Sequence, residues 1–298
     1  MLSAEQIRLM RMAGAASVAV ATILIGLKLW AWLATDSVSL LGSLADSLLD
    51  VIASLITFFA VRVAVAPPDY EHRFGRGKSE AIAGLMQAVI VLGSAVYVAT
   101  EAFIRLSAPA QISAPFVGIT VMVVSVLLTL LLLGFQRYVI SKTGSLAISA
   151  DATHYKADIL TNVGVLAAIY LNYGLGWYVA DPLLGLLIVG VIFVSVRTIA
   201  IQAVDVLLDR ELPPQVHKSI FELAANHSAV LGVHDIRTRS SGARQFIQFH
   251  LELDPDMTLT EAHEICDEVE RRLLERFPSA EVLIHADPFG LFEQRDAF

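Results

Sequence analysis

The chain has a single cysteine and no surplus of positive charge. Cys266 alone cannot form a disulfide within the chain, and it gives no evidence of an oxidising compartment. Acidic residues number 29 against 21 lysines and arginines, for a formal net charge of −8. A nucleic-acid partner would call for a basic stripe or patch. We therefore expect neither an internal disulfide nor nucleic-acid binding.

Charge is scarce along the first part of the chain. Hydrophobic residues make up 56% of the composition, which is too apolar for a typical soluble globule. Positions 205–298 are rich in Asp, Glu, Arg and His, whereas positions 12–66 contain only five charged residues: Lys28, Asp36, Asp46, Asp50 and Arg62. This contrast predicts a membrane part followed by a polar part.

Six apolar stretches are each long enough to cross about 30 Å of hydrocarbon as a helix. They lie at about 14–34, 39–64, 80–106, 115–137, 147–172 and 178–202. The first is too long for a signal-peptide core and is expected to remain as a membrane anchor. We predict a bundle of six transmembrane helices over residues 1–208 and a cytoplasmic α+β domain over residues 209–298.

Lysine and arginine are distributed unevenly between the predicted connections. The connections at 35–39 and 172–181 have neither, and the side of the membrane that they share offers only Arg105. The other side carries ten basic residues: Arg8, Arg11, Arg62, Arg73, Arg76, Lys78, Arg137, Lys142, Arg197 and Arg210. Because basic residues favour the cytoplasmic side, both termini are expected to be cytoplasmic.

The polar part has the pattern of a small α-β-β-α-β domain. A first amphipathic helix is indicated by Val216, Ile220 and Leu223 after a pair of prolines. The segments LGVHDIRTRS and ARQFIQFHLEL alternate apolar and polar residues around SSGA, as a hairpin does. TLTEAHEICDEVERRLLERFP predicts a second helix, and AEVLIHADP a last strand. This order predicts an open α+β sandwich with its helices on one face.

Two pairs of potential metal ligands lie inside predicted spans. Asp46 and Asp50 are four residues apart in the second span, and His154 and Asp158 are four apart in the fifth. Residues four apart share one face of a helix. At about 1.5 Å per residue, and because the two spans run antiparallel, the pairs are expected to meet near one depth.

An ionised Asp at the bilayer centre costs about 2.5 to 3.5 kcal/mol on insertion scales, so these carboxylates need a partner. A divalent cation would supply one: three carboxylates and one imidazole suit tetrahedral zinc and also accept cadmium, cobalt, manganese or ferrous iron. The alternative is that the carboxylates pair with Lys28 or Lys156, or face water, as structural polar contacts. We favour a metal site.

Four further histidines and an aspartate gather in the polar part. His234 and His250 lie on the predicted hairpin strands, and His285 and Asp287 are two apart on the last strand, which places them on one face of the sheet. Together with His263 they predict a second metal site. His217 and His227 are interpreted as ordinary helix residues.

The complete pattern resembles the cation diffusion facilitator family, and most closely its bacterial branch of zinc and iron efflux proteins. The resemblance covers nearly the whole chain and depends on ADSLLD, HRFGRGK, HYKADILTN, VHDIRTR, FIQFHLELD and VLIHADP. It implies a homodimer in a bacterial inner membrane that exchanges metal for protons by alternating access. Asp46, Asp50, His154 and Asp158 match the family's transport site.

The resemblance also implies roles for residues outside the spans. A metal site at the dimer interface is matched by His234, His250, His263, His285 and Asp287, and a charged contact that holds the dimer together is matched by Lys78 and Asp209. In the inner loop, close relatives carry an Asp and two His. Here Asp69 and His72 remain, but Arg76 takes the third place, and a guanidinium cannot bind metal. This loop site is therefore expected to be weak or lost.

Two other classes of protein are compatible with such a metal site. An intramembrane metalloenzyme could use paired carboxylates and a histidine to hold a catalytic metal, although the H-E-x-x-H signature is absent. A membrane-bound metal sensor would need neither six spans nor a site at mid-membrane. We predict a divalent-metal transporter, with zinc as the first candidate, that contacts membrane lipid, metal ions and protons.

Overall fold

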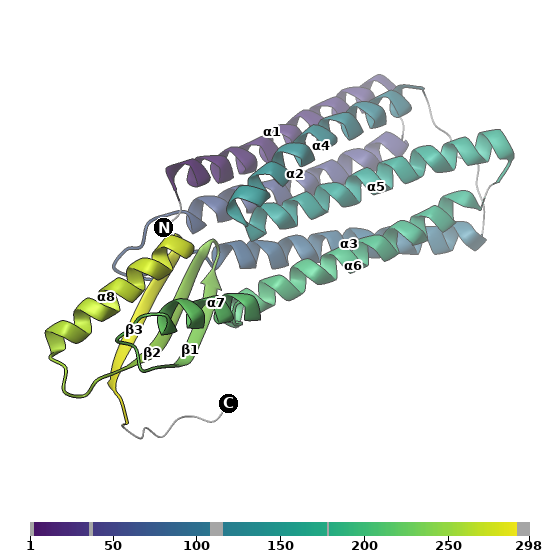
Figure 1. The fold of residues 1–298 in the computed structure, drawn as a ribbon. Coiled ribbons are helices and arrows are strands. Elements are labelled where there is room, and N and C mark those ends of the chain that lie inside the picture. The colour runs from purple at the N-terminus through teal and green to yellow at the C-terminus, as the bar shows by residue number, and fades with distance from the viewer. Residues whose placement is uncertain (1–2, 36–37, 108–115, 178, 291–298) are drawn as a thin grey trace. The chain divides into compact units, whose positions relative to one another are not determined.

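The computed structural model describes residues 3–35, 38–107, 116–177 and 179–290 (Figure 1). The chain divides into two compact units, which are Ala4–Val204 and, mainly, Asp205–Phe298. Each unit is described by itself below. The predicted connections at 35–39 and 108–113 lie wholly or partly outside the described residues.

The first unit consists of six long helices. They are α1 (Ala4–Thr35), α2 (Val38–Ala64), α3 (Ser79–Ser107), α4 (Phe116–Thr143), α5 (Leu146–Leu175) and α6 (Ala180–Leu207). Each overlaps one predicted span. α1 begins about ten residues before its predicted span, because a helix satisfies its own backbone hydrogen bonds and can continue into water beyond the apolar stretch.

Five of these helices, all except α5, are long and apolar enough to cross a membrane in their described parts. α5 is as long as its neighbours, but Asp151, His154, Lys156 and Asp158 lie within two of its turns. The helix that deviates from a simple membrane pattern is thus the one that carries a predicted metal-binding pair. An ionisable residue inside a span indicates a functional site.

The helices pack closely where small residues face one another. α1 packs against α2 and α4, α5 packs against α3 and α4, and α2 packs against α3 (Figure 1). α6 lies beside α3, where Gly185 approaches Ala102 and Val98.

A two-residue connection joins α4 to α5, and Gly144 there has a φ of +64°, which a residue with a side chain rarely adopts.

The second unit has the predicted α-β-β-α-β order: α7 (Pro214–Ala225), β1 (Gly232–Ser241), β2 (Arg244–Leu253), α8 (Leu259–Arg276) and β3 (Ala280–Pro288). β2 is central, antiparallel to β1 and parallel to β3. Thr258 caps α8, because its hydroxyl accepts the Glu261 N–H while the Glu261 carboxylate accepts the Thr258 N–H.

Alternation along β2 separates the two faces of the sheet. Ile247, Phe249 and Leu251 are buried and pack against Ile220 of α7 and Leu273 of α8. The residues between them, including His250, therefore point to the face opposite α7 and α8. The predicted sandwich with helices on one face is confirmed.

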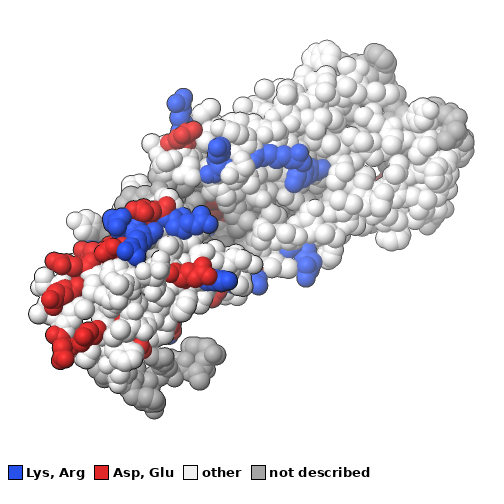
Figure 2. Space-filling view, in the orientation of Figure 1, with Lys and Arg blue, Asp and Glu red and all other residues white. Residues whose placement is uncertain are grey.

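The charge distribution follows this division of the chain. In Figure 2, most of the visible surface of the helical unit carries no charged side chain, whereas acidic and basic side chains crowd the α+β unit. Large apolar side chains such as Leu131, Phe193 and Val194 are more than half exposed on the helices. An apolar outer surface of this kind is typical of a protein whose solvent is lipid.

Candidate metal centres

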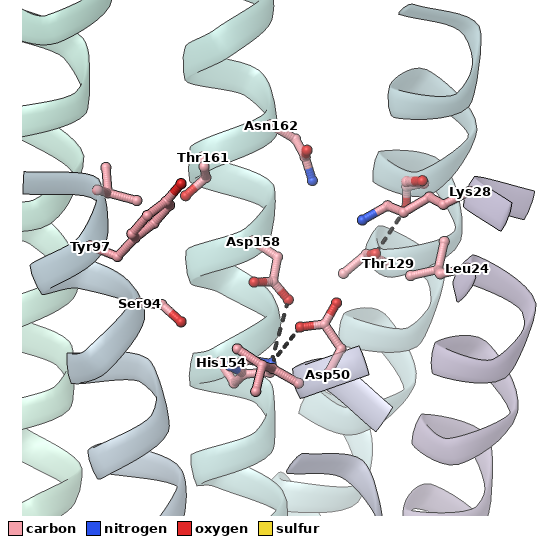
Figure 3. A pocket seen from close by; sticks show the side chains of 13 residues that line it. Leu24, Lys28, Asp50, Ser94, Tyr97, Thr129, His154, Asp158, Thr161 and Asn162 are labelled. Atoms are coloured by element: carbon pink, nitrogen blue, oxygen red, sulfur yellow. Dashed lines mark hydrogen bonds and ion pairs between the residues drawn. The ribbon is translucent and has the colours of Figure 1, made fainter. Parts of the chain in front are cut away.

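The first centre joins α2 and α5 near the middle of the helical unit. His154 Nε2 lies 3.1 Å from Asp50 Oδ1 and 3.8 Å from Asp158 Oδ2. Each of the three residues has one potential ligand atom, and these three atoms lie within 4.8 Å of one another. Figure 3 shows the three side chains pointing toward one another. The spacing of four residues places His154 and Asp158 on the face of α5 that meets α2, as predicted.

The fourth predicted ligand, Asp46, belongs to α2 one helical turn from Asp50, but its side chain lies outside the described residues. Asp50 and His154 are only 8% and 3% exposed, and both line a cavity. That cavity has a volume of about 130 Å³. Two carboxylates and an imidazole with free approach from one side form a donor set that a divalent cation can enter.

The same cavity is lined by Lys28, one of the two lysines that could pair with the carboxylates of the spans. Lys28 belongs to α1, and its Nζ donates to Ser47 Oγ at 2.6 Å. Lys156 is exposed and, two residues from His154, lies on another side of α5. Ser94, Tyr97, Thr161 and Asn162 complete the polar wall on the side toward the Leu175 end of α5 (Figure 3).

Sequence analysis missed a second acidic residue of α5. Asp151 is completely buried, and its carboxylate accepts hydrogen bonds from Ser17 Oγ at 2.6 Å and Gln136 Nε2 at 2.7 Å. It lies three residues before His154, one turn toward the Leu146 end. That spacing was visible in ADATH and could have shown that Asp151 shares a face with His154.

The second centre lies on the sheet face opposite α7 and α8. His234 pairs with His250 across β1 and β2, and His250 pairs with His285 across β2 and β3, so the three histidines form one row. Asp287 is 7% exposed and lies at the middle of the cluster: its carboxylate is 2.7 Å from His250 Nδ1, 3.0 Å from His285 Nε2 and 3.5 Å from His234 Nε2. His234, His250 and Asp287 can all reach one metal ion.

Two residues extend this cluster beyond the prediction. Glu252 Oε1 lies 3.3 Å from His234 Nε2, and Asp235 Oδ2 lies 3.7 Å from His250 Nε2. Glu252 is two residues after His250, so strand alternation could have identified it. Asp235 reaches the cluster because an irregularity in β1 lies between His234 and Arg237, and Asp235 itself has a φ of +49°. The sequence gives no signal for that bulge.

His263 does not join the cluster within this chain. It lies on α8, where Asp267 Oδ2 is 3.6 Å from its Nε2 and 73% of its side chain is exposed. α8 packs on the opposite face of the sheet from His250. The sequence pattern grouped these histidines because it could not show that the sheet separates them.

The predicted loop site has an arginine where a metal would bind. Arg76 Nη2 lies 2.5 Å from Asp69 Oδ2, while Asp69 Oδ1 accepts the backbone N–H groups of Glu71 and His72. The guanidinium and these hydrogen bonds hold the pKa of Asp69 below its ordinary value. His72 Nδ1 is 3.5 Å from the same carboxylate. Both carboxylate oxygens of Asp69 thus have hydrogen-bond donors, and a guanidinium cannot bind metal; that this loop site is weak or lost stays a prediction.

The two residues of the predicted dimer contact belong to different compact units. Lys78 lies immediately before α3, and Asp209 follows α6 with a φ of +56°. Asp209 Oδ1 lies 3.4 Å from Arg239 Nη1 of β1. Their role in a dimer stays a prediction.

Helices that expose apolar residues to lipid, around a buried site of carboxylates and imidazole, define a membrane protein that handles cations. The cation efflux transmembrane domain matches residues 15–208, and the cation efflux protein cytoplasmic domain matches residues 212–289. The chain belongs to the cation efflux family, also called the cation diffusion facilitator family. It is a cation efflux transporter and not an enzyme.

Curated relatives cover almost the whole chain. The cation-efflux pump FieF of Yersinia enterocolitica is 43% identical over 94% of this chain and 93% of its own length, and FieF of Pectobacterium carotovorum has the same identity and coverage. Among solved structures, the metal-bound C-terminal domain of the CzcD transporter from Thermotoga maritima is 30% identical over 27% of this chain and 94% of that chain, with a TM-score of 0.26. Because the family models and the FieF relatives show a cation efflux transporter, the alternatives of a metalloenzyme and of a sensor without transport are set aside.

Proposed function

We propose that the chain exports zinc from the cytoplasm of a bacterium in exchange for protons. One observation carries this proposal: His154 lies within 4 Å of both Asp50 and Asp158 at the end of a buried cavity between membrane helices. With Asp46 one turn along α2, the site would offer one nitrogen and three carboxylate donors. Zinc binds four such donors tetrahedrally, whereas magnesium and calcium prefer six or more oxygens.

Exchange for protons follows from the chemistry of the same donors. Carboxylate and imidazole must be deprotonated to bind a metal, so metal and protons compete for them. A site that faces the cytoplasm at neutral pH would load zinc, and protons from the opposite side would favour its release. The basic residues in alternate connections favour a cytoplasmic position for both termini. The membrane of this proposal is the bacterial inner membrane.

The test is zinc uptake by the purified protein in liposomes with an imposed proton gradient. We expect uptake that is faster with the gradient than without it, and slower uptake of manganese than of zinc. Parallel measurements with ferrous iron and cadmium compare the other candidate ions. If manganese or iron moves while zinc does not, the assignment of zinc is wrong; if no metal movement responds to the gradient, proton exchange is wrong.

The histidine cluster of the second unit is proposed as a regulatory zinc site in a homodimer. Residues His234, His250 and Asp287 fit one zinc ion, and Glu252 or His285 can complete its coordination. Metal that binds one arrangement of the protomers more tightly than another would favour that arrangement.

We expect the combined change of His234 and His250 to Ala to remove one class of bound zinc and to weaken the stimulation of transport by zinc. Equilibrium dialysis on the full-length protein measures the first effect, and uptake at increasing zinc measures the second. His217→Ala on α7 is the matched control. If bound zinc and the response to zinc both stay at wild-type levels, the regulatory site is refuted.

For the loop, we expect Arg76→His to create a zinc-binding capacity that the wild type lacks. The change removes the guanidinium from Asp69 and adds an imidazole near His72. Dialysis should find about one more bound zinc per chain than in the wild type. Arg73→His, a few residues away, is the control. The same stoichiometry in wild type and Arg76→His would contradict the conclusion that Arg76 blocks this site.

A further inference from the structure

The region between the metal centre and the Leu146 end of α5 contains buried polar groups that metal binding does not use. Ser17 of α1, Gln87 of α3, Gln136 of α4 and Asp151 of α5 are all at most 1% exposed. We call these four residues the polar layer. Asp151 lies at its centre, about 4.5 Å along α5 from His154.

α3 takes part in this layer through one side chain. Gln87 Nε2 lies 2.7 Å from the carbonyl oxygen of Ala53 and 3.0 Å from Thr57 Oγ1, both on α2, and 3.4 Å from Asp151 Oδ1 on α5. One amide group thus connects three helices. Two of these acceptors are within one helical turn of the ligand Asp50 or His154 along their helices.

A second side chain attaches the start of α3 to the start of α5. Glu80 is 1% exposed, and its Oε2 accepts hydrogen bonds from Ser145 Oγ at 2.7 Å and from the Ala147 N–H at 3.3 Å. The free N–H groups at the beginning of a helix favour an acidic partner. The next residue back, Ser79, donates to the carbonyl oxygen of Ala60 on α2 at 3.1 Å.

The other half of α3 packs against α6 and borders the cavity on its other side. Ser94, Tyr97 and Val98 line the cavity that leads to Asp50 and His154. α3 is therefore hydrogen-bonded to α2 and α5 on the Leu146 side of the metal centre, whereas on the Leu175 side it borders the cavity. The metal centre is reached from the Leu175 side, where the cavity lies.

We propose that Glu80 and Gln87 are positioning residues that close the metal centre toward the Leu146 end of α5, and that α3 leaves these contacts when the centre opens to that end. This inference relies on the proposed function only in taking Asp50, His154 and Asp158 as the transport site. A transported ion must meet its site from each side in turn, so contacts that exist in one state alone set the balance between the states.

The composition of the layer suits a barrier that opens to an ion. Among the described residues, Gln87 Oε1 and Gln136 Oε1 are buried without a hydrogen-bond donor. Buried acceptors normally have hydrogen-bond donors. In the closed layer these two amide oxygens have none, and water or a hydrated cation could donate to them once the helices part. Together with Asp151 they would line the opened path with oxygen atoms, which suit a cation.

Two tyrosines report on the two sides of the centre. Tyr155 is completely buried, and its hydroxyl group bonds with Ser54 Oγ and donates to the Ser17 carbonyl oxygen beside the layer. Tyr97 lines the cavity on the Leu175 side. Brief hydroxyl-radical labelling of the full-length protein in liposomes, read by mass spectrometry, measures the access of water to each ring without any need for zinc transport.

We expect Gln87→Ala to raise labelling of Tyr155 about threefold or more and to lower labelling of Tyr97, because losing the contacts of the closed layer favours the opposite state. Glu80→Gln should shift both tyrosines in the same directions. Thr100→Ala is the matched control, since Thr100 is exposed on α3 and donates to the Val96 carbonyl oxygen of its own helix. It should label as the wild type does.

Labelling of Tyr155 that stays at the wild-type level in both variants would overturn the proposal, and so would a parallel rise of Tyr97 and Tyr155, which indicates general loosening. If neither variant folds, hydrogen exchange in the wild type decides. We then expect exchange at Ser79–Gln87 to increase under every zinc or pH condition that increases Tyr155 labelling; labelling without such exchange refutes the role of α3. A protein that moves no zinc would refute the zinc assignment without affecting this result.

Discussion

Liposomes carrying Asp50→Ala are expected to take up zinc no faster than empty liposomes under the same proton gradient. Asp50 is buried, and its carboxylate lies closer to His154 Nε2 than that of Asp158 does. Removing a neighbour of a metal ligand already costs about 10- to 100-fold in affinity, so loss of a ligand should cost at least about 100-fold. Asp158→Ala should have the same effect.

The control for this experiment must remove a carboxylate without touching the site. Asp256→Ala does so, because Asp256 lies in an exposed turn between β2 and α8. It should transport zinc at the wild-type rate. Both variants should elute as the wild type does in size-exclusion chromatography. Substantial gradient-driven uptake by a folded Asp50→Ala variant would show that zinc does not cross through this centre.

Lowering the pH from 7.5 to 5.5 is expected to weaken zinc binding at the first metal centre about tenfold or more. A histidine ordinarily titrates near 6.5, and zinc requires its neutral form, so each pH unit below that value should cost about a factor of ten per bound imidazole. The sign is fixed by the chemistry: protonation opposes binding, and affinity rises with pH. Isothermal titration in detergent at several pH values measures the effect, on protein in which His234 and His250 are changed to Ala so that the second centre does not contribute.

A variant without the imidazole tests the origin of this dependence. His154→Asn should bind zinc more weakly at pH 7.5 and should lose most of the change between pH 6 and 7. Asp69 cannot supply the effect, because Arg76 holds its pKa below the ordinary range and its carboxylate stays charged between pH 5.5 and 7.5. Zinc affinity that is constant over this range in the wild type would contradict competition between metal and protons.

The architecture could be predicted almost completely, since its signals are local. A run of about 20 apolar residues has no stable alternative to a helix inside lipid, and the alternation in FIQFHLEL leaves a strand one buried face. The differences concern helix ends, as at Ala4, where the helix continues past the apolar stretch into polar sequence. Hydropathy shows which residues tolerate lipid, and it does not determine where the helix begins.

The metal centre was predictable where ligands are four residues apart. His154 and Asp158 had to share a face of α5, and the only span with a similar acidic pair is the second. The three-residue spacing places Asp151 on the face of His154, but nothing in the sequence distinguishes a carboxylate that is buried against Ser17 and Gln136 from one that reaches water. Its partners are 134 and 15 residues away along the chain.

Sequence alone determined the number and type of the elements, the division into an apolar and a polar part, and the acidic and imidazole groups available to a cation. Only the tertiary structure decided which of them meet. It separated His263 from the other histidines by the thickness of a sheet, gave Asp69 to Arg76, and attached α3 through Gln87 to α2 and α5 on one side of the centre. Periodicity acts within a helix or strand, whereas these contacts depend on how the elements pack, which no local pattern encodes.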